Sequence, residues 1–150
     1  MRFLIQRVTN GSVAIEGRTV GQIGKGLVVL IGIGREDDET VADRMVKKLL
    51  GLRIFEDENG KTNLALKDVD GELLLISQFT LYADCRHGNR PGFTLAGEPL
   101  RSKELYEYII DKCKADVPVV ERGVFGADMA VSLVNDGPFT VMLDSGELQI

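Results

Sequence analysis

The chain has 150 residues, of which 44% are hydrophobic and 27% charged, and its formal net charge is −5. This length and composition are typical of one globular domain, so we predict a single domain over residues 1–150. Proteins that bind long nucleic acids normally have a net positive charge. The net negative charge of this chain therefore argues against such a protein, and against a DNA-binding protein in particular. No apolar run approaches the ~18–20 residues of a membrane span and no signal-peptide pattern is present, so we expect a cytoplasmic protein with no membrane partner.

Two cysteines and one histidine limit the metal and redox chemistry of this chain. Cys85 and Cys113 lie far apart and form no Cys-x-x-Cys motif, which favours two reduced thiols. Because His87 is the sole imidazole, four soft ligands for a structural zinc ion cannot be assembled. We therefore expect neither a metal site nor a cofactor.

The N-terminal quarter is predicted to form a β-meander. Asn10-Gly11 is a typical hairpin turn signal and separates two short strand-like runs. A third run is continuously apolar and rich in β-branched residues, as in a central strand covered on both faces. The strands expected here are Arg2–Val8, Ser12–Glu16, Val20–Ile23 and Leu27–Ile33.

Two amphipathic segments predict helices. In Asp38–Leu50 apolar residues recur at helical spacing behind an acidic first turn, and Leu100–Ala115 also shows a helical pattern. Further short strands are predicted at Pro118–Glu121, Met129–Val134 and Phe139–Leu143. The fold class is therefore α+β, with two main helices and roughly eight to ten mostly antiparallel strands.

A stretch with unusual polarity runs from Leu73 to Asp84 and reads LLLISQFTLYAD. It begins as a buried strand, and we expect the strand to span about Glu72 to Tyr82. Ser77, Gln78 and Thr80 interrupt its apolar run, and an unpaired buried polar group costs roughly 1–3 kcal/mol. These side chains therefore need partners, either on a neighbouring strand or on a ligand, and we interpret this strand end as one wall of a site.

The segment Asn135-Asp136-Gly137-Pro138 is predicted to be a turn that forms the other wall. A proline between two β-forming runs cannot donate to a ladder and therefore marks a turn or the end of pairing. X-Pro bonds are cis in only about 5–6% of folded cases, so the residues alone favour a trans bond at Pro138.

Several other chemistries remain open from the residues alone. Gly32-x-Gly34 after a strand resembles the start of a dinucleotide-binding fingerprint, but the third glycine is missing and acidic residues follow. A Ser77–His87 pair would make a small-molecule esterase, and Cys85 is a possible thiol nucleophile, although neither lies in a known nucleophile motif. A non-catalytic RNA-binding module is a third class.

A local cationic patch follows the polar strand end. Residues 84 to 103 contain the cations Arg86, Arg90, Arg101 and Lys103. Solvated loop charges explain the patch, and so does a rim that contacts an anion.

Taken together, the motifs of this chain resemble the D-aminoacyl-tRNA deacylase (D-tyrosyl-tRNA deacylase) family. The resemblance covers nearly the full length and includes the family hallmarks Ser-Gln-x-x-Thr and Asn-x-Gly-Pro. Its segments are Gln6-Arg7-Val8, SQFTLYAD from Ser77 to Asp84, Arg90-Pro91, FGADM from Phe125 to Met129, and SLVNDGPFT from Ser132 to Thr140.

The resemblance implies an enzyme that hydrolyses the ester between a D-amino acid and the terminal ribose of tRNA. It also implies a barrel-like core and a homodimer, in which a cis Gly137-Pro138 bond reaches into the partner's pocket and rejects L side chains. Arg7 is expected to orient that turn, and glycyl-tRNA is expected to be cut as well. Ser77, Gln78, Phe79 and Thr80 would hold the aminoacyl group, while Phe125 and Met129 would line the pocket for the terminal adenosine.

Two catalytic routes follow from the same resemblance. Thr80 is either the nucleophile or a polarising group, or else the ribose 2′-hydroxyl of the tRNA activates water. In the second route, backbone N–H groups near Phe79 and Thr80 would stabilise the oxyanion. The second route is favoured because no general base stands beside Thr80 in the sequence and an aminoacyl ester is already labile.

Overall fold

A computed structural model describes residues 1–149 of the chain. Its centre is a six-stranded mixed sheet with the order β2-β1-β3-β6-β7, and β8 pairs with β1 alongside this path. β1 pairs antiparallel with β2, β3 and β8, whereas β3–β6 and β6–β7 are parallel pairs. The strands are β1 (Arg2–Ile15), β2 (Arg18–Ile23), β3 (Gly26–Gly32), β6 (Glu72–Ser77), β7 (Val120–Arg122) and β8 (Ala130–Asp144).

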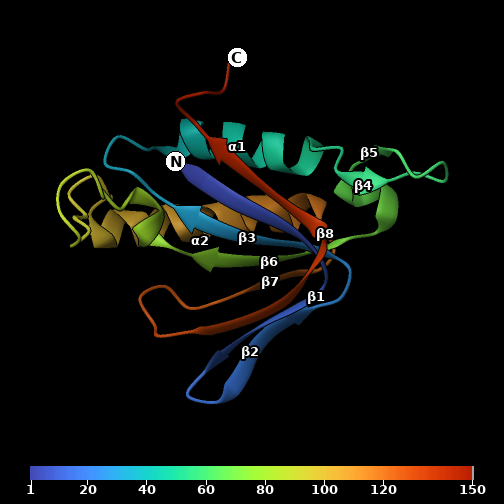
Figure 1. Cartoon of the computed structure of the whole chain (residues 1–150), viewed down its shortest axis with the longest axis horizontal. Helices are drawn as coiled ribbons and strands as arrows, with labels where there is room; N and C mark the ends of the chain where they lie inside the picture. The colour runs from blue at the N-terminus through green and yellow to red at the C-terminus, as the bar shows by residue number, and fades with distance from the viewer. Residues whose placement is uncertain (150) are drawn as a thin grey trace.

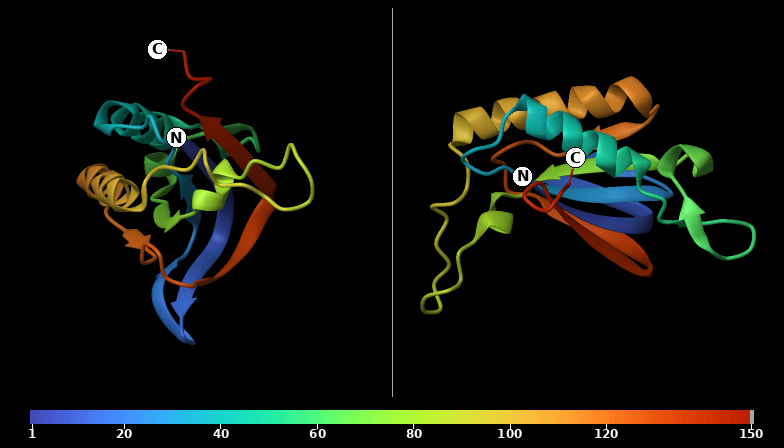
Figure 2. Two further views of the ribbon diagram at one scale, coloured as in Figure 1. Left: turned by 90° about the vertical axis from the view of Figure 1, so that its left-hand side faces the viewer. Right: turned by 90° about the horizontal axis from the view of Figure 1, so that it is seen from above.

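Two helices cover one face of this sheet (Figure 2). α1 (Glu39–Gly51) is capped by the Asp38 carboxylate, which accepts from the N–H of Val41. α2 is Pro99–Asp116, and the proline stands in its first turn, where a missing N–H costs nothing. The short elements are β4 (Phe55–Glu56), β5 (Thr62–Leu64), and the 3₁₀ turns η1 (Leu66–Val69) and η2 (Phe79–Tyr82).

The core is divided between the two faces of the sheet. The larger cluster lies between the sheet and the two helices, and includes the fully buried Phe3, Leu75 and Tyr106. A smaller cluster fills the inside of the curved sheet and contains Val28 and Leu74. Side chains of β3 and β6 enter both clusters, so the prediction that these apolar runs are covered on both faces is confirmed.

The sheet curls into a nearly closed barrel (Figure 1). β2 approaches β7 closely: a Cβ placed on Gly21 would lie 2.9 Å from the carbonyl oxygen of Arg122. The predicted α+β class with a barrel-like core and two main helices is confirmed, and the central pairing is mixed. No helix among residues 1–149 is long and apolar enough to span a membrane.

Two details of the predicted strands are wrong. Asn10-Gly11 is not a turn, because β1 continues through it with irregular register against β8. Gly11 instead allows close packing, since a Cβ there would lie 2.8 Å from Val28 Cγ2. Likewise, Ala130–Asp144 is the single strand β8, where two strands separated by a turn were expected. Its register against β1 jumps from Val8–Asn135 to Gln6–Thr140, so residues 136–139 bulge out of the ladder, and this bulge is called the Gly137-Pro138 turn below.

Candidate active site

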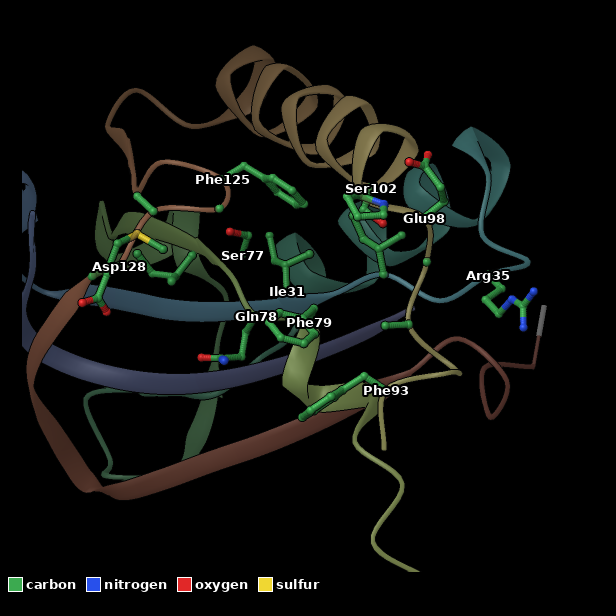
Figure 3. Close-up of a pocket in the computed structure, with 18 of the residues that line it drawn as sticks. Ile31, Arg35, Ser77, Gln78, Phe79, Phe93, Glu98, Ser102, Phe125 and Asp128 are labelled. Carbon is green, nitrogen blue, oxygen red and sulfur yellow. The ribbon is translucent and has the colours of Figure 1, made fainter. Parts of the chain in front are cut away.

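A cavity of about 790 Å³ opens at the carboxyl ends of the parallel strands β3 and β6. Ligand sites in sheets with parallel strands commonly lie at this edge. Residues 125–129, the start of α2 and the loop before it complete the walls (Figure 3). The lining includes Ile31, Arg35, Ser77, Gln78, Phe79, Phe93, Glu98, Ser102, Phe125 and Met129.

The polar stretch after β6 changes conformation at the edge of the cavity. β6 ends at Ser77, and the expected strand as far as Tyr82 is wrong, because Phe79–Tyr82 forms the 3₁₀ turn η2. The backbone N–H of Gln78 makes the last link to β3, donating to Ile31 O at 2.7 Å. The first N–H groups of a helical turn have no acceptor within it, and no side chain caps this one. Its N–H groups at Phe79 and Thr80 are therefore available to a ligand.

Of the four residues predicted to hold an acyl group, three line the cavity and one lies beside it. Ser77, Gln78 and Phe79 line the cavity. Thr80 is exposed at its edge, and its Oγ1 accepts a hydrogen bond from Gln78 Nε2 at 2.5 Å. No carboxylate or imidazole contacts the Thr80 hydroxyl among the described hydrogen bonds, so this hydroxyl has no general base at hand.

The glycines at the end of β3 serve to pack η2. A Cβ on Gly32 would lie 2.8 Å from Leu81 Cβ, and one on Gly34 would lie 2.9 Å from the Tyr82 ring. Burial raises the pKa of Tyr82 well above its ordinary value. The Gly-x-Gly pattern therefore reflects close packing of an aromatic ring.

The wall opposite η2 is held by a buried tyrosine. The Tyr106 hydroxyl donates to Leu75 O at 2.7 Å, and Gly123 N donates to the same oxygen at 3.1 Å. The Tyr106 ring contacts the ring of Phe125, with centroids 6.1 Å apart. Burial raises the pKa of Tyr106 to about 12, so its hydroxyl remains a donor at neutral pH. A Cβ on Gly123 would lie 2.5 Å from Met129 Sδ, which shows how closely this segment packs.

The start of α2 supplies a third side of the cavity. The Glu98 carboxylate accepts from the N–H groups of Leu100 and Arg101, and these bonds lower its pKa. Arg35 also lines the cavity and donates from Nη1 to Thr94 O at 3.3 Å. Neither Arg35 nor Phe93 was predicted as a site residue. The available signal for Arg35 was its position directly after a buried strand.

The Gly137-Pro138 turn lies outside this cavity. Its peptide bond is cis, in contrast to the general preference of X-Pro bonds, and both residues are exposed. Arg7 is 6% exposed, donates from Nε to Asp136 O at 3.1 Å, and donates from Nη1 to Ile54 O at 2.8 Å.

A side-chain bridge and an aromatic contact complete the support of the turn. Asn135 Oδ1 accepts from the N–H of Phe139 at 2.8 Å, and Asn135 Nδ2 donates to Thr140 Oγ1 at 2.8 Å. The Arg7 guanidinium also stacks over the Phe139 ring, 4.7 Å from its centroid. The turn is therefore fixed from both sides.

The two predicted walls lie at opposite ends of the sheet within one chain (Figure 1). Val8, next to Arg7, pairs with Gly26 at the start of β3, whereas Ser77 pairs with Ile31 near its end. Five residues of strand separate these positions, a distance of about 17 Å. The prediction that the two segments face each other is therefore not met within a single chain.

Two of the four cations in the predicted patch are paired with carboxylates. Arg86 forms a bidentate ion pair, or fork, with the Asp84 carboxylate, and Arg101 forms a second one with Glu39. Neither Arg90 nor Lys103 lines the cavity. Among the described residues, Arg35 is the cation in its wall.

The alternative nucleophiles are not assembled. Cys85 and His87 lie in the protruding loop after Asp84 and do not line the cavity, whereas Ser77 does. Cys113 is buried in the core, and burial raises its pKa to about 12. Over residues 1–149 no group of three or more histidine, cysteine or acidic side chains is placed to hold a metal ion.

The chain is similar in sequence to D-aminoacyl-tRNA deacylases. A family model described as D-Tyr-tRNA(Tyr) deacylase matches residues 4–144. A D-aminoacyl-tRNA deacylase of Clostridium novyi is 55% identical over 147 residues and covers 97% of each chain. One from Thermotoga petrophila is 50% identical over 148 residues and covers 99% of each chain.

Solved structures agree with these matches. One titled "c-Myc DNA Unwinding Element Binding Protein" superimposes with a TM-score of 0.91 at 38% identity, covering 96% of this chain and 98% of the other. A probable eukaryotic D-amino acid tRNA deacylase shares the fold, with a TM-score of 0.80 at 19% identity and coverage of 95% and 97%. The chain therefore belongs to the D-Tyr-tRNA(Tyr) deacylase family.

Proposed function

We propose that this protein hydrolyses the ester bond of D-aminoacyl-tRNA and releases the free D-amino acid and tRNA. The match of residues 4–144 to the family model carries this proposal. The cavity adds support, because it has room for an aminoacyl-adenosine and combines apolar walls with a few polar groups. Such an enzyme would act in chiral proofreading, in the cytoplasm where tRNA is charged and used.

We assign the two ends of the cavity to the two parts of the substrate. Ser77, Gln78, Phe79 and Thr80 hold the aminoacyl group at the end of β6. Phe125 and Met129, on the opposite wall, hold the terminal adenosine. The aromatic ring and the thioether are suited to a flat base, since both offer polarisable apolar surface.

The active enzyme is proposed to be a homodimer, with Gly137-Pro138 of one chain in the cavity of the other. The separation of about 17 Å within one chain supports this arrangement, because the turn cannot reach its own cavity. The turn is exposed yet held by Arg7, as expected of an element that must keep its shape while inserted elsewhere. Its carbonyl groups would leave no room for an L side chain.

Glycyl-tRNA is expected to be a second substrate. The proposed filter acts by excluding a side chain on one side of the α-carbon. Glycine has no side chain there, so the turn offers no basis for rejecting it.

We propose that the substrate's own 2′-hydroxyl activates the attacking water. Water adds to the ester carbonyl, the backbone N–H groups of Phe79 and Thr80 hold the oxyanion, and the bond to the ribose 3′ oxygen breaks. The proton lost by water ends on that leaving oxygen. The Thr80 hydroxyl already accepts a hydrogen bond from Gln78 and has no base to take its proton, which favours this route over attack by Thr80.

The direct test is incubation with the same amino acid attached to the same tRNA as its D and L ester. We expect rapid release from the D ester and little above the spontaneous rate from the L ester. Equal release from both would contradict the proposed filter, and release from neither would contradict the activity.

The catalytic route has its own test in Thr80→Ala. We expect this variant to keep most of the wild-type kcat/KM, because the route uses the backbone at this position. A loss near ~10³-fold with an intact fold would instead make Thr80 the reacting group.

A further inference from the structure

An exposed aromatic pair and a cation form the outer rim of the cavity. The ring of Phe93 meets the ring of Phe79 edge to face, with centroids 5.0 Å apart. Phe79 is 56% exposed and Phe93 is 40% exposed, although both line the cavity. Large apolar side chains at the mouth of a cavity are usually covered by something that binds there.

Arg35 completes this rim (Figure 3). It is exposed, and its described hydrogen bond is the one to Thr94 O in the Phe93 loop. Over residues 1–149 it makes no ion pair, in contrast to Arg86 and Arg101, which hold carboxylates. Its guanidinium is therefore available to an anion of the ligand.

The position of the rim points to the nature of the ligand. In the proposed function the terminal adenosine lies against Phe125 and Met129. Phe125 lies on the side of the cavity away from Arg35 (Figure 3). The RNA strand continues from this adenosine through its 5′ phosphate and must leave through the mouth of the cavity. Bases of single strands stack on aromatic side chains, and guanidinium groups bind phosphate.

We propose that Phe93 and Arg35 form a subsite for the nucleotide that precedes the terminal adenosine. The base of that nucleotide stacks on Phe93, and the phosphate that joins it to the adenosine binds Arg35. This inference rests on the proposed function and adds a second point of contact with the RNA. It also explains how an acidic protein holds tRNA, since one or two phosphate contacts suffice when a base is stacked.

The test compares two esters of the same D-amino acid, one on full tRNA and one on adenosine alone. The adenosine ester has neither the preceding base nor the phosphate. Phe93→Ala is expected to lower kcat/KM on the tRNA ester by about 5- to 150-fold, the range for loss of one base–aromatic stack. The loss on the adenosine ester is expected to be at least five-fold smaller, and Phe93→Tyr is expected to restore the tRNA activity.

Arg35→Gln tests the phosphate contact separately. For the tRNA ester, the slope of log kcat/KM against log salt concentration is expected to become shallower by about 0.7, the value for one phosphate on a single strand. Matched controls are Leu95→Ala, an apolar side chain of the same loop that is 45% exposed and outside the lining, and Arg53→Gln, an exposed cation bonded to Asn63. Both controls are expected to match the wild type on both esters.

Four results would overturn the subsite. Equal losses on both esters would mean that Phe93 shapes the cavity itself. A change of oligomeric state in Phe93→Ala, seen by sedimentation, would mean that a second copy of the chain covers the rim. If the wild type releases the amino acid from neither ester, the proposed function fails, and the subsite fails with it. Activity of the wild type on both esters, with no tRNA-specific loss in the variants, contradicts the subsite alone.

Discussion

The two ends of the central sheet differ in how they hold their polar residues. At the carboxyl ends of β3 and β6, several elements surround a concave cavity, and exposed N–H groups of η2 border it. At the other end, Gly137-Pro138 forms an exposed turn that is anchored from behind by the buried Arg7. In the proposed homodimer, the first region receives the substrate and the second is inserted into the partner's cavity.

Because of this difference, we expect substitutions in the cavity and in the Gly137-Pro138 turn to have effects of different size. The cavity depends on many weak contacts, so single changes in its support should produce graded effects. The turn depends on a few short contacts and an unusual backbone conformation, so single changes there should produce large ones. The following predictions test that contrast.

The largest effect is expected from Gly137→Ala. Gly137 has φ of +130°, and an added Cβ would lie 3.0 Å from Arg7 Nη2 and 3.3 Å from Phe139 N. A non-glycine residue held at such a backbone conformation costs about 1–3 kcal/mol. A displaced turn should lower the D-over-L ratio of deacylation by about 100-fold, as expected for a misplacement of about 1 Å.

The matched control is Gly60→Ala, at a glycine with φ of +74° and no atom within 4 Å of the added Cβ. It also places a side chain at positive φ, at a backbone cost of about 1–2 kcal/mol, but lies away from both regions. Similar losses of selectivity in the two variants would show that stability, and not the shape of the turn, is responsible.

A moderate effect is expected from Tyr106→Phe, which removes the hydroxyl that donates to Leu75 O at 2.7 Å behind the Phe125 wall. Loss of one buried hydrogen bond should lower the free energy of unfolding by about 1 kcal/mol, measured by urea denaturation. Because the wall is loosened and the reacting groups are untouched, we expect KM to rise more than kcat falls.

Tyr108→Phe is the control for this variant, since the Tyr108 hydroxyl bonds Asp43 on the exposed surface. Its free energy of unfolding should lie within about 0.5 kcal/mol of the wild-type value. A fall in kcat without a rise in KM in Tyr106→Phe would place the effect on the chemistry and contradict a supporting role for Tyr106.

The smallest effect concerns pH and the loop beside the cavity. The Arg86 guanidinium and backbone N–H lower the pKa of Asp84 to about 2, from an unfolded value of about 3.9. Because the folded pKa is the lower one, the fork favours the folded loop above pH ~4 and loses that contribution as the pH falls through about 2. An NMR titration of the Asp84 carboxyl should therefore show a midpoint near 2.

Arg86→Gln should move this midpoint toward about 3.9. The Arg86 side chain is 73% exposed, so water screens the ion pair and we expect no measurable change in global unfolding at neutral pH. A wild-type midpoint near 4 would mean that the fork is not maintained in solution.

Much of the fold was predictable because it follows from local patterns. Apolar runs with β-branched residues identified β3 and the first part of β6 as strands buried on both faces. Helical periodicity identified α1 and α2 to within one or two residues. Ser77 and Gln78 were predicted to border a site because polar groups at the end of a buried strand need partners, and both line the cavity.

The errors occurred where contacts between distant segments override local preference. Residues 79–82 alternate like a strand, but Leu81 and Tyr82 turn to pack over Gly32 and Gly34. Asn10-Gly11 reads as a turn, but β1 continues because both β2 and β8 pair with it.

The sequence by itself determined the fold class, the two motifs Ser-Gln-x-x-Thr and Asn-x-Gly-Pro, and the family. All three depend on residue types in a fixed order. Only the tertiary structure decided that Ser77 and Gly137 lie at opposite ends of the sheet. It also brought Arg35 and Phe93 to one rim and paired two of the four expected cations, Arg86 and Arg101, with carboxylates. The physical reason is that a site is defined by distances across the sheet, and these depend on strand order, register and packing between residues far apart in the chain.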